Sequence, residues 1–437
     1  MTASTTTVPP TGPPTLPPSL YAATARPGPA TPALDGDATV SVAVIGGGFT
    51  GLSTALHLAE SGTDVMLLEA HEPGWGASGR NGGQVNPGLK PDPDAVVRDW
   101  GPELGGRMVA FAWSAPDRLF DLIGRWQIEC DARNGGTIRA ATSARHAAGV
   151  RRTAEDCMRR GMPVSLLDAA GAAEATGCGR YGAAMLDRRG GDVQPLDLAR
   201  GLAGAAIKAG ARVHGGTRAL SLRREGLVWC IETPFGTVRA DSVVLGANGY
   251  TDDLLPGLRR SVVPVFSSIA ASAPLPDAVA DRVLPSGSVL YESGPITVYL
   301  RRDRGNRLLI GGRGPQRPIR DASAVAYLMR YAERLWPGLV GVPWTHGWNG
   351  QLAMTTDHYP HVHEPAPGLF ACLGYNGRGV ALAISMGAEI GRRVNRAGAD
   401  TLCMPTTAVR PIRFHGFWRA GVVAKVLEGR VRERFGL

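Results

Sequence analysis

The pattern of apolar and polar residues predicts a strand, a helix and a second strand between residues 41 and 69. Residues 41–48, SVAVIGGG, form an apolar run rich in Val and Ile that ends in glycines, as buried parallel strands do. The run DVMLLE at 64–69 predicts the second strand. Between them, apolar side chains at three- and four-residue spacing before Gly62 predict a helix with a glycine stop, and these are Leu52, Ala55, Leu56 and Ala59.

Three glycines mark the turn from the first strand into the helix. Gly46, Gly48 and Gly51 fit the pattern G-x-G-x-x-G, and Glu69 ends the second strand. Gly46 permits a tight turn, Gly48 lets a pyrophosphate approach the backbone, and Gly51 lets the helix pack closely on the strand. The helix N-terminus offers free N–H groups to phosphate, and Glu69 accepts hydrogen bonds from a ribose diol. The unit predicts dinucleotide binding without distinguishing a nicotinamide from a flavin.

A second glycine-rich stretch follows Glu69 after only a few residues. Residues 75–83, WGASGRNGG, hold four glycines beside Ser78, Arg80 and Asn81. This stretch is too rich in glycine to form regular structure. Its bare amides and polar side chains suit a pyrophosphate and the edge of a flavin ring, so we expect FAD to lie beside Ser78, Arg80, Asn81 and Gly82.

These two stretches resemble a known family. VAVIGGGFTGLSTALHLAESGTDVMLLEA (42–70) followed by GWGASGRNGGQV (74–85) is similar to the D-amino-acid oxidase superfamily of FAD-dependent amine oxidoreductases, in the branch of γ-glutamylputrescine oxidase. Segment 190–222 resembles the family's second cofactor-facing segment, where the resemblance places Ala219 by the adenine. Segment 369–394 resembles the closing strand and helix, where Gly377, Gly379 and Val380 would face the flavin.

The resemblance implies an α/β fold with a Rossmann-like FAD-binding domain and a second α+β domain whose mixed sheet covers the flavin. We expect the FAD-binding domain to be discontinuous, formed by residues 40–105, 180–260 and 355–400. Its further central strand, SVVLGANGY (242–250), would end at the cofactor with Gly249 in close approach. The substrate domain would take residues 106–179 and 261–354, with helices at 103–127 and 143–161 and strands at 261–273 and 288–311.

The family's reaction gives the expected chemistry. A carbon next to an amine nitrogen would lose a hydride to flavin N5, and the resulting imine would hydrolyse in water. Oxygen, giving hydrogen peroxide, or another electron acceptor would take the electrons. Relatives that attach FAD covalently use a cysteine just before a T-x-D turn, whereas the matching segment here, WNGQLAMTTDHYP (348–360), has none. We therefore expect non-covalent FAD.

The same segment bears on the substrate, which we expect to be a small-molecule amine. Glycine-oxidase relatives use an arginine here to bind the substrate carboxylate, where this chain has Gln351 and Leu352. This argues against a simple D-amino-acid or glycine oxidase, unless Arg301 or Arg302 takes the task. The candidate residues for the substrate cavity are Tyr291, Tyr299, Trp348 and Gln351, and Lys90 is the one lysine placed to activate oxygen.

Composition narrows the remaining classes. The net charge is +9, but the basic residues are spread along the chain and are nearly all arginine, so we expect no nucleic-acid partner. The six cysteines form no C-x-x-C pair, which favours free thiols in a cytoplasmic protein. His358, His361 and His363 lie close in sequence, yet no acid or cysteine completes the set, and we expect no metal.

The two ends of the chain differ from the rest. Residues 1–39 carry nine prolines within the first 32 positions and predict a disordered or extended tail. Residues 401–437 form a basic tail whose segment 414–437 has an amphipathic pattern. We expect this segment to dock on the protein's own surface, with a peripheral membrane contact as the alternative.

Several functions remain open at this point. The first is oxidation of a γ-glutamyl polyamine or a similar amine. Others are a cyclic imino-acid or D-amino-acid oxidase, and a dehydrogenase that passes electrons to an acceptor other than oxygen. A protein that carries FAD without catalysing a reaction is the alternative from another class.

Overall fold

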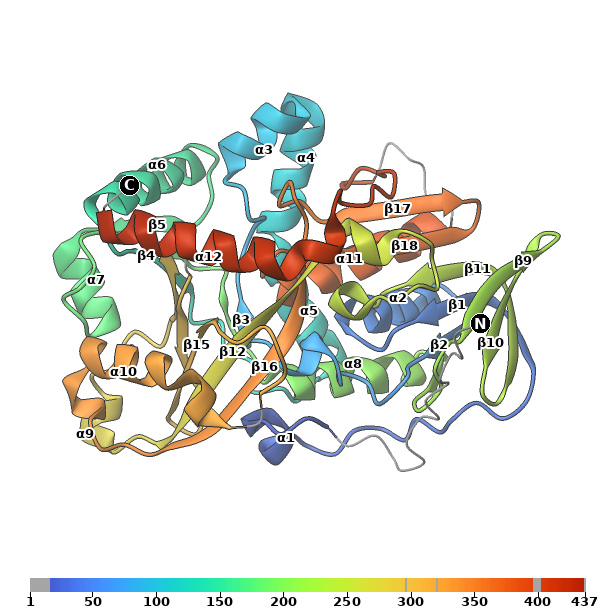
Figure 1. Ribbon diagram of the computed structural model, residues 1–437, viewed down its shortest axis with the longest axis horizontal. Coiled ribbons are helices and arrows are strands. Elements are labelled where there is room, and N and C mark those ends of the chain that lie inside the picture. The colour runs from blue at the N-terminus through green and yellow to red at the C-terminus, as the bar shows by residue number, and fades with distance from the viewer. Residues whose placement is uncertain (1–15, 295–296, 320, 396–401, 436–437) are drawn as a thin grey trace.

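Two large β-sheets, one at the right and one at the left of Figure 1, form the framework of the molecule. They come from a computed structural model that describes residues 16–294, 297–319, 321–395 and 402–435. Each sheet contains eight strands within the described residues. Helices cover the sheets, and the chain crosses between them several times, so neither sheet is built from one continuous stretch of sequence.

The first sheet is parallel at its centre. Strand β1 is paired in parallel with β2 and β11, β2 with β8, and β11 with β18, while β17, β10 and β9 extend the sheet by antiparallel pairs. Its strands are β1 (Ala38–Ile45), β2 (Val65–Leu68), β8 (Arg212–His214), β9 (Ser221–Glu225), β10 (Val228–Thr233), β11 (Gly236–Leu245), β17 (His361–Ala366) and β18 (Leu369–Leu373).

Helices bury one face of this sheet. Helix α2 (Phe49–Glu60) packs between α8 (Pro195–Lys208) and α11 (Gly379–Val394), and α11 also contacts α5 (Ala115–Trp126). Nearly every residue of α2 is buried because neighbours cover it on several sides. Helices α3 (Pro93–Trp100) and α4 (Pro102–Trp113) complete this layer. The helical prediction for residues 103–127 is confirmed by α4 and α5.

The second sheet is mixed, and runs in the order β16-β12-β15-β14-β13-β4-β6-β5. Its strands are β4 (Thr137–Ala141), β5 (Val164–Leu167), β6 (Ala184–Asp187), β12 (Val263–Pro274), β13 (Val289–Ser293), β14 (Tyr299–Arg302), β15 (Arg307–Arg313) and β16 (Trp344–Met354). Helices α6 (Ala144–Arg159), α7 (Ala169–Thr176), α9 (Asp277–Ala280) and α10 (Ala326–Leu335) lie along its outer side (Figure 1). The α/β class with a Rossmann-like parallel sheet and a second mixed sheet is confirmed.

Short elements complete the framework. Strands β3 (Gln84–Val85) and β7 (Gly191–Asp192) form a small antiparallel ribbon. The single helical turns are η1 (Ala77–Gly79), η2 (Asn248–Tyr250), η3 (Leu258–Ser261), η4 (Ala322–Val325), η5 (Pro337–Leu339) and η7 (His415–Phe417).

The N-terminal segment differs from the expectation of a wholly disordered or extended tail. Residues 1–15 lie outside the described residues, but Leu20–Thr24 form helix α1, capped by the Ser19 hydroxyl. Tyr21 is 1% exposed, and its ring lies edge-on to Trp348 with 5.1 Å between the centroids. Residues 20–24 are folded because Leu20 and Tyr21 are buried against Trp348 and other apolar side chains of the second sheet.

The C-terminal helix α12 (Trp418–Phe435) crosses the front of the molecule in Figure 1, from the side of the first sheet towards α6. The preceding segment is attached to the body, since the Ile412 N–H donates to the Arg260 carbonyl and the His415 ring to the Val262 carbonyl. No helix among the described residues is long and apolar enough to cross a membrane.

A buried ion pair joins β7 to β14. The Arg301 guanidinium donates to Asp192 at 2.9 Å, to the Gly82 carbonyl at 2.8 Å and to the Tyr21 hydroxyl at 3.1 Å. Arg133 adds two bonds to the same carboxylate, at 2.9 and 2.6 Å. The contacts connect α1, the glycine-rich loop and the second sheet.

Replacing this carboxylate tests that connection. Asp192→Ala leaves Arg301 buried without a counter-charge, so we expect the free energy of unfolding to fall by roughly 3–5 kcal/mol. The control is Asp253→Ala, which breaks the exposed pair with Arg259 and should cost at most about 1 kcal/mol. Urea denaturation followed by circular dichroism measures both, and equal losses would contradict the connecting role of Asp192.

Candidate functional site

A large cavity is lined by residues of both sheets. Its volume is about 1500 Å³, and it extends from the ends of β1 and β2, at Ile45 and Leu68, to Tyr299 and Arg313 on the second sheet. Pockets for a single small ligand are usually about 300–1,000 Å³. This cavity is therefore large enough for a dinucleotide together with a substrate.

One end of the cavity is formed by the turn between β1 and α2. Gly46 has φ 109°, a conformation that favours glycine. A Cβ atom at Gly51 would lie 2.0 Å from the Gly46 carbonyl oxygen, so only glycine lets α2 begin so close to β1. Gly48 precedes the helix, and no side chain of its own caps it. The N-terminus of α2 therefore faces the cavity with bare backbone, as a pyrophosphate requires.

Glu69 lies beside this turn. Its carboxylate accepts hydrogen bonds from the Gly47 N–H at 2.6 Å and the His71 N–H at 2.8 Å. Burial raises the pKa of Glu69, although backbone N–H groups, Gly47's first, act in the opposite direction. Each carboxylate oxygen keeps a lone pair for a further donor, so Glu69 fits the ribose diol expected there.

His71 is a feature of this end that sequence reasoning missed. Its ring stacks on Trp75 with 3.9 Å between centroids, and both residues line the cavity. The His71 Nδ1 atom is buried and has no hydrogen-bond partner among the residues that the structure describes. A buried polar atom without a partner is costly, so a bound ligand that supplies one would stabilise this arrangement.

The glycine-rich loop forms the adjoining wall. The Ser78 hydroxyl accepts from the Phe49 N–H at 2.9 Å, which ties the loop to the first turn of α2. Asn81 braces the loop, donating to the Ser78 carbonyl at 2.7 Å and accepting from the Gly83 N–H at 2.7 Å. A Cβ at Gly82 would lie 2.6 Å from the Tyr299 ring, so this close approach depends on glycine.

Arg80 is held within the protein. It donates to the Tyr250 hydroxyl at 2.6 Å and to the Gly76 carbonyl at 3.2 Å, and its guanidinium lies 4.8 Å from the Trp75 ring centroid. Burial lowers its pKa. Arg80 lines the cavity, with three of its nitrogens already donating to protein oxygens.

A second helix N-terminus faces the cavity from the other direction. Helix α11 begins after Arg378, and no side chain among the described residues caps it. Gly377 has φ 85°, and the preceding Asn376, at φ 54°, is held by bonds between its side-chain oxygen and the Thr355 N–H. Two helix N-termini whose own N-cap side chains do not cap them, bare glycine backbone and a buried acid together fit FAD.

Most of the expected cofactor residues line this one cavity. They are Gly46, Gly48, Glu69, Ser78, Arg80, Asn81, Gly82, Ala219, Gly377, Gly379 and Val380. Gly51 and Gly249 do not line it and lie behind its wall. A Cβ at Gly249 would lie 2.7 Å from the Gln351 carbonyl oxygen, so its smallness allows β16 to approach η2.

The residues expected to be catalytic divide into two groups. Lys90 and Tyr299 line the cavity. Trp348 and Gln351 do not: the Trp348 indole donates to the Arg80 carbonyl at 3.1 Å, and the Gln351 amide donates to the Gly249 carbonyl. Trp348 therefore supports the glycine-rich loop, whereas Gln351 supports η2. Tyr291, the further aromatic candidate, does line the cavity.

The two arginines offered as alternative carboxylate ligands lie elsewhere. Arg301 is 4% exposed and occupied by Asp192, Gly82 and Tyr21, while Arg302 donates to the Ala280 carbonyl. Neither lines the cavity.

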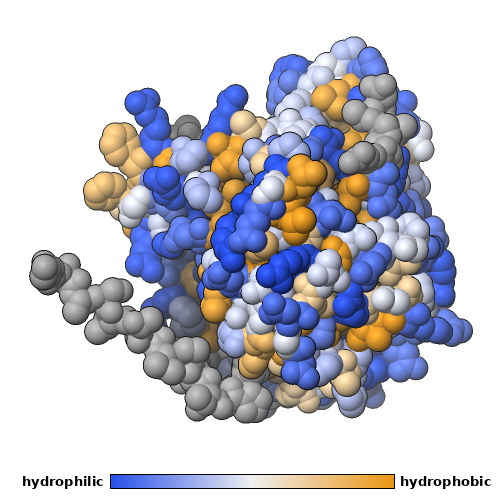
Figure 2. Space-filling view, turned by 90° about the vertical axis from the view of Figure 1, so that its right-hand side faces the viewer, coloured by the Kyte–Doolittle hydropathy of each residue, from blue (hydrophilic) through white to orange (hydrophobic). Residues whose placement is uncertain are grey.

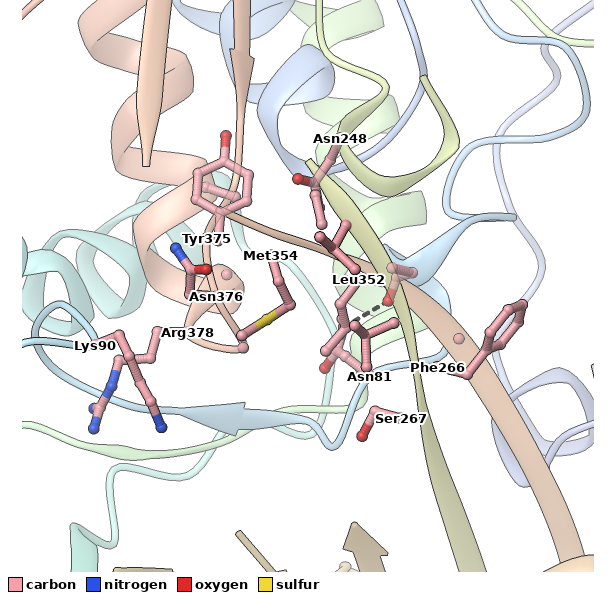
Figure 3. Close-up of a pocket in the computed structure, with 18 of the residues that line it drawn as sticks. Asn81, Lys90, Asn248, Phe266, Ser267, Leu352, Met354, Tyr375, Asn376 and Arg378 are labelled. Atoms are coloured by element: carbon pink, nitrogen blue, oxygen red, sulfur yellow. Dashed lines mark hydrogen bonds between the residues drawn. The ribbon is translucent and has the colours of Figure 1, made fainter. Parts of the chain in front are cut away.

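Part of the positive charge that lines the cavity belongs to arginines that the sequence analysis did not single out. Arg139, Arg313 and Arg378 line it together with Lys90 and His358. Arg378 lies inside segment 369–394, whereas Arg139 lies on β4 and Arg313 ends β15. Figure 3 shows Lys90 and Arg378 side by side on one side of the pocket, with Leu352 and Phe266 on the other.

The Lys90 side chain is exposed because it faces the open cavity. The surrounding protein nevertheless replaces much of the water that would otherwise stabilise its charge. Burial first, and then the positive charges of Arg378, Arg139 and Arg313, lower the pKa of Lys90 to about 8 against the opposing effect of Asp92. Native Lys90 thus binds its proton more weakly than the unfolded chain does. Its contribution opposes folding below pH 8 and disappears as the pH rises from about 8 towards 10.5.

The C-terminal segment closes one side of the cavity. Residues from Ile412 to Gly429, including Phe417, Trp418 and Val422, are among its lining. Val422 is 8% exposed, so this side of α12 docks on the protein itself.

The histidines near residue 360 and the cysteines form no metal site or disulfide among the described residues. Within the described residues, no group of three histidine, cysteine or acidic side chains is placed to hold a metal ion. His361 pairs with Asp357 and His363 bonds to the Thr407 carbonyl. The six cysteines are free thiols.

The depressed pKa of Lys90 is measurable because the chain has only three lysines. After reductive ¹³C-methylation, we expect one of three dimethyl-lysine NMR signals to titrate near pH 8, and this signal to be missing in Lys90→Arg. Titration of all three signals near the ordinary lysine value of 10.5 would contradict the arrangement of charges around Lys90.

Comparison with known proteins identifies the family to which the chain belongs. A family model described as FAD dependent oxidoreductase (DAO) matches residues 41–393. The chain is 33% identical over 371 residues to the probable oxidoreductase OrdL of Rhizobium meliloti (strain 1021), covering 84% of this chain and 85% of that protein. It is 32% identical over 365 residues to the gamma-glutamylputrescine oxidoreductase of Escherichia coli (strain K12), covering 83% and 85%.

Among solved structures, the glycine oxidase of Geobacillus kaustophilus has a TM-score of 0.71 at 24% identity, covering 86% of this chain and 99% of that one. The L-proline dehydrogenase of P. horikoshii has a TM-score of 0.69 at 17% identity, covering 88% and 99%. These two likenesses concern the fold alone. With the family match over most of its length, this chain belongs to the DAO family of FAD-dependent oxidoreductases.

Proposed function

We propose that this protein oxidises a C–N bond of a small amine or amino-acid derivative, of which a γ-glutamyl polyamine is one form. The observation that carries the proposal is the single cavity, which joins a glycine-lined dinucleotide cradle to a chamber lined by side chains of the second sheet. The similarity to a gamma-glutamylputrescine oxidoreductase supports this reaction class. The bound FAD would supply the hydride acceptor, and oxygen, forming hydrogen peroxide, would take the electrons.

The chain's own residues have separate tasks in this proposal. Gly46, Gly48 and Glu69 hold the ADP half, and Ala219 lies beside the adenine. Ser78, Asn81, Gly82, Gly377, Gly379 and Val380 shape the flavin site, and Arg80 fixes the glycine-rich loop. We propose that FAD binds non-covalently, which is supported by the absence of any cysteine among the described lining residues.

The chamber next to the flavin site orients the substrate and excludes water. Leu352, Met354 and Phe266 present apolar surface to it. Tyr299 is bonded to the Ser267 hydroxyl at 2.9 Å, so the position of its ring against Gly82 is fixed. We assign Trp348 and Gln351 a positioning role, because Trp348 bonds to the glycine-rich loop and Gln351 bonds to η2. Oxygen activation by Lys90 stays a prediction.

An anaerobic absorption spectrum tests the proposal. We expect the flavin bands near ~450 nm to bleach when a suitable amine is added, and to return with air. The panel should contain γ-glutamylputrescine, pipecolate, sarcosine, iminodiacetate and D-alanine. Acid precipitation should release all of the flavin into the supernatant if binding is non-covalent.

Two results would count against this function. A protein that retains FAD which no amine in the panel reduces would favour a non-catalytic FAD carrier. A protein that purifies without flavin and takes up no FAD would contradict the cofactor site itself.

A dehydrogenase that delivers electrons at a membrane is the second candidate. The observation in its favour is a group of exposed apolar side chains before and on α12: Phe414 is 82% exposed, Phe417 74%, Val423 55% and Leu427 54%. Arg413, Arg419 and Lys425 are exposed beside them. Figure 2, where the front of Figure 1 lies at the left, shows apolar side chains projecting among hydrophilic ones at that edge. This combination suits an anionic lipid surface.

Co-sedimentation with vesicles decides between the two acceptors. A membrane dehydrogenase should bind phosphatidylglycerol vesicles but not phosphatidylcholine vesicles, and should reduce a quinone analogue faster than oxygen. Phe414→Ser with Phe417→Ser should abolish vesicle binding, whereas Phe235→Ser, at an exposed phenylalanine far from α12 in sequence, should not. Absence of vesicle binding together with stoichiometric peroxide formation would leave the oxidase.

A further inference from the structure

The part of the cavity lined by the second sheet carries positive charge that the protein does not neutralise. Lys90 follows β3, Arg313 ends β15 and Arg378 precedes α11, so three distant segments bring these cations together. Each lowers the pKa of a neighbour, since Arg378 and Arg313 act on Lys90, and Lys90 and Arg313 act on His358. All three side chains line the same cavity, and Figure 3 shows Lys90 beside Arg378.

Arg139, the fourth cation here, differs because it is compensated. Its guanidinium bonds to Asp92 at 2.6 Å and to the Ser293 hydroxyl at 2.8 Å. This pair leaves no net charge for a ligand. It also marks one boundary of the cationic region.

The other three lack a carboxylate. Arg378 is fixed by bonds to the Pro87 carbonyl at 2.8 Å and the Tyr291 hydroxyl at 2.9 Å, both neutral acceptors. Lys90 and Arg313 have no side-chain hydrogen bond or ion pair to any residue that the structure describes. Burial is the one cause that lowers the pKa of Arg313.

The acid in this part of the cavity, Glu292, is hydrogen-bonded to two tyrosine hydroxyls. It is 4% exposed and accepts hydrogen bonds from the hydroxyls of Tyr181, at 2.9 Å, and Tyr331, at 2.6 Å. Glu69, Asp252 and Glu428 also line the cavity, but they belong to other walls. Like charges without counter-charges repel one another, so an anion supplied by a ligand would stabilise this cluster.

The opposite wall is apolar. Figure 3 places Lys90 and Arg378 together on one side and Leu352 and Phe266 on the other, with Met354 between them. Further out, the exposed Arg145 and Arg152 line the cavity and would attract anions towards it. A negatively charged ligand would therefore be drawn to the side of the chamber that holds Lys90 and Arg378.

We propose that Lys90, Arg313 and Arg378 form an anion subsite that binds substrate carboxylate, so that the preferred substrates are amines carrying net negative charge, with dicarboxylates ahead of monocarboxylates. The proposal rests on the proposed amine oxidation and narrows its substrate class. N-carboxyalkyl amino acids are the chemical type that fits. Free di- and polyamines, which bring only positive charge, would be rejected.

The subsite also predicts how efficiently the γ-glutamyl polyamines would react relative to other amines. γ-Glutamylputrescine offers one carboxylate, but an α-ammonium group accompanies it and would face the same cations. We therefore expect the specificity constant, kcat/KM, to fall in the order iminodiacetate, sarcosine, γ-glutamylputrescine, putrescine. Equal or higher turnover of putrescine would overturn the proposal.

Binding of an unreactive dicarboxylate separates the subsite from the chemistry. Thiodiacetate has sulfur in place of the amine nitrogen of iminodiacetate, so it offers both carboxylates but no C–N bond. Isothermal titration calorimetry on the FAD-loaded protein should show one site for thiodiacetate and none for its neutral diamide. Binding should also raise the pKa of Lys90 in the NMR titration.

Single substitutions test which residues form the anion subsite. Arg313→Met and Lys90→Met should each weaken thiodiacetate binding by roughly 10- to 100-fold, as expected for loss of a charge-assisted hydrogen bond. Arg313→Lys and Lys90→Arg keep the charge and should retain most of the affinity. Arg259→Met, which removes an exposed arginine outside the cavity, is the matched control and should bind normally.

The outcomes distinguish this inference from the proposed function. If an amine bleaches the flavin but thiodiacetate does not bind, or binds equally well to both methionine variants, the anion subsite is wrong and amine oxidation stands. If thiodiacetate binds as described but no amine reduces the flavin, the subsite is supported and the proposed catalysis fails.

Discussion

The contact between the first turn of α2 and the ends of β1 and β11 is the constraint on which the cofactor site depends. A Cβ at Gly51 would lie 2.0 Å from the Gly46 oxygen, and one at Gly246 would lie 3.1 Å from the Gly51 nitrogen. Because all three positions are glycine, the helix begins directly at the sheet. Its N-terminus then points along the cavity, and Gly47 comes within hydrogen-bond distance of Glu69.

The second sheet is attached to this unit by a different kind of interaction. Arg301 on β14 bonds to Asp192, to the Gly82 carbonyl and to Tyr21, so a buried charge fixes the glycine-rich loop against the substrate side. Arg301 shares the Asp192 carboxylate with Arg133. Lys90, Arg313 and Arg378 have no such carboxylate, and the contrast separates charges that hold the fold from charges available to a ligand.

Most of the residues expected to bind the cofactor line one cavity, and their sequence signals are local. G-x-G-x-x-G, the acid after β2 and the loop 75–83 each act within a few residues, and their backbone conformations follow from glycine. The α/β class followed from the same segments. Residues 20–24 were misjudged because the burial of Tyr21 depends on Trp348, which is far away in sequence.

The substrate end was less predictable because its residues also depend on contacts between segments far apart in sequence. Trp348 bonds to the glycine-rich loop and Gln351 bonds to η2, which no local pattern indicates. The cationic cluster combines a loop, the end of β15 and the start of α11, and none of these residues belongs to a motif that marks a carboxylate site. Lys90 was singled out as a lone lysine, but its altered pKa comes from arginines that only the tertiary structure brings near.

A crystal structure of the protein with FAD and thiodiacetate would test the central claim, that one cavity holds the cofactor and an anionic substrate end to end. The account predicts the ribose at Glu69, the isoalloxazine between Gly82 and Gly377, and a carboxylate within hydrogen-bond distance of Arg313 and Lys90. A dinucleotide bound outside this cavity, or a carboxylate bound away from these cations, would contradict it.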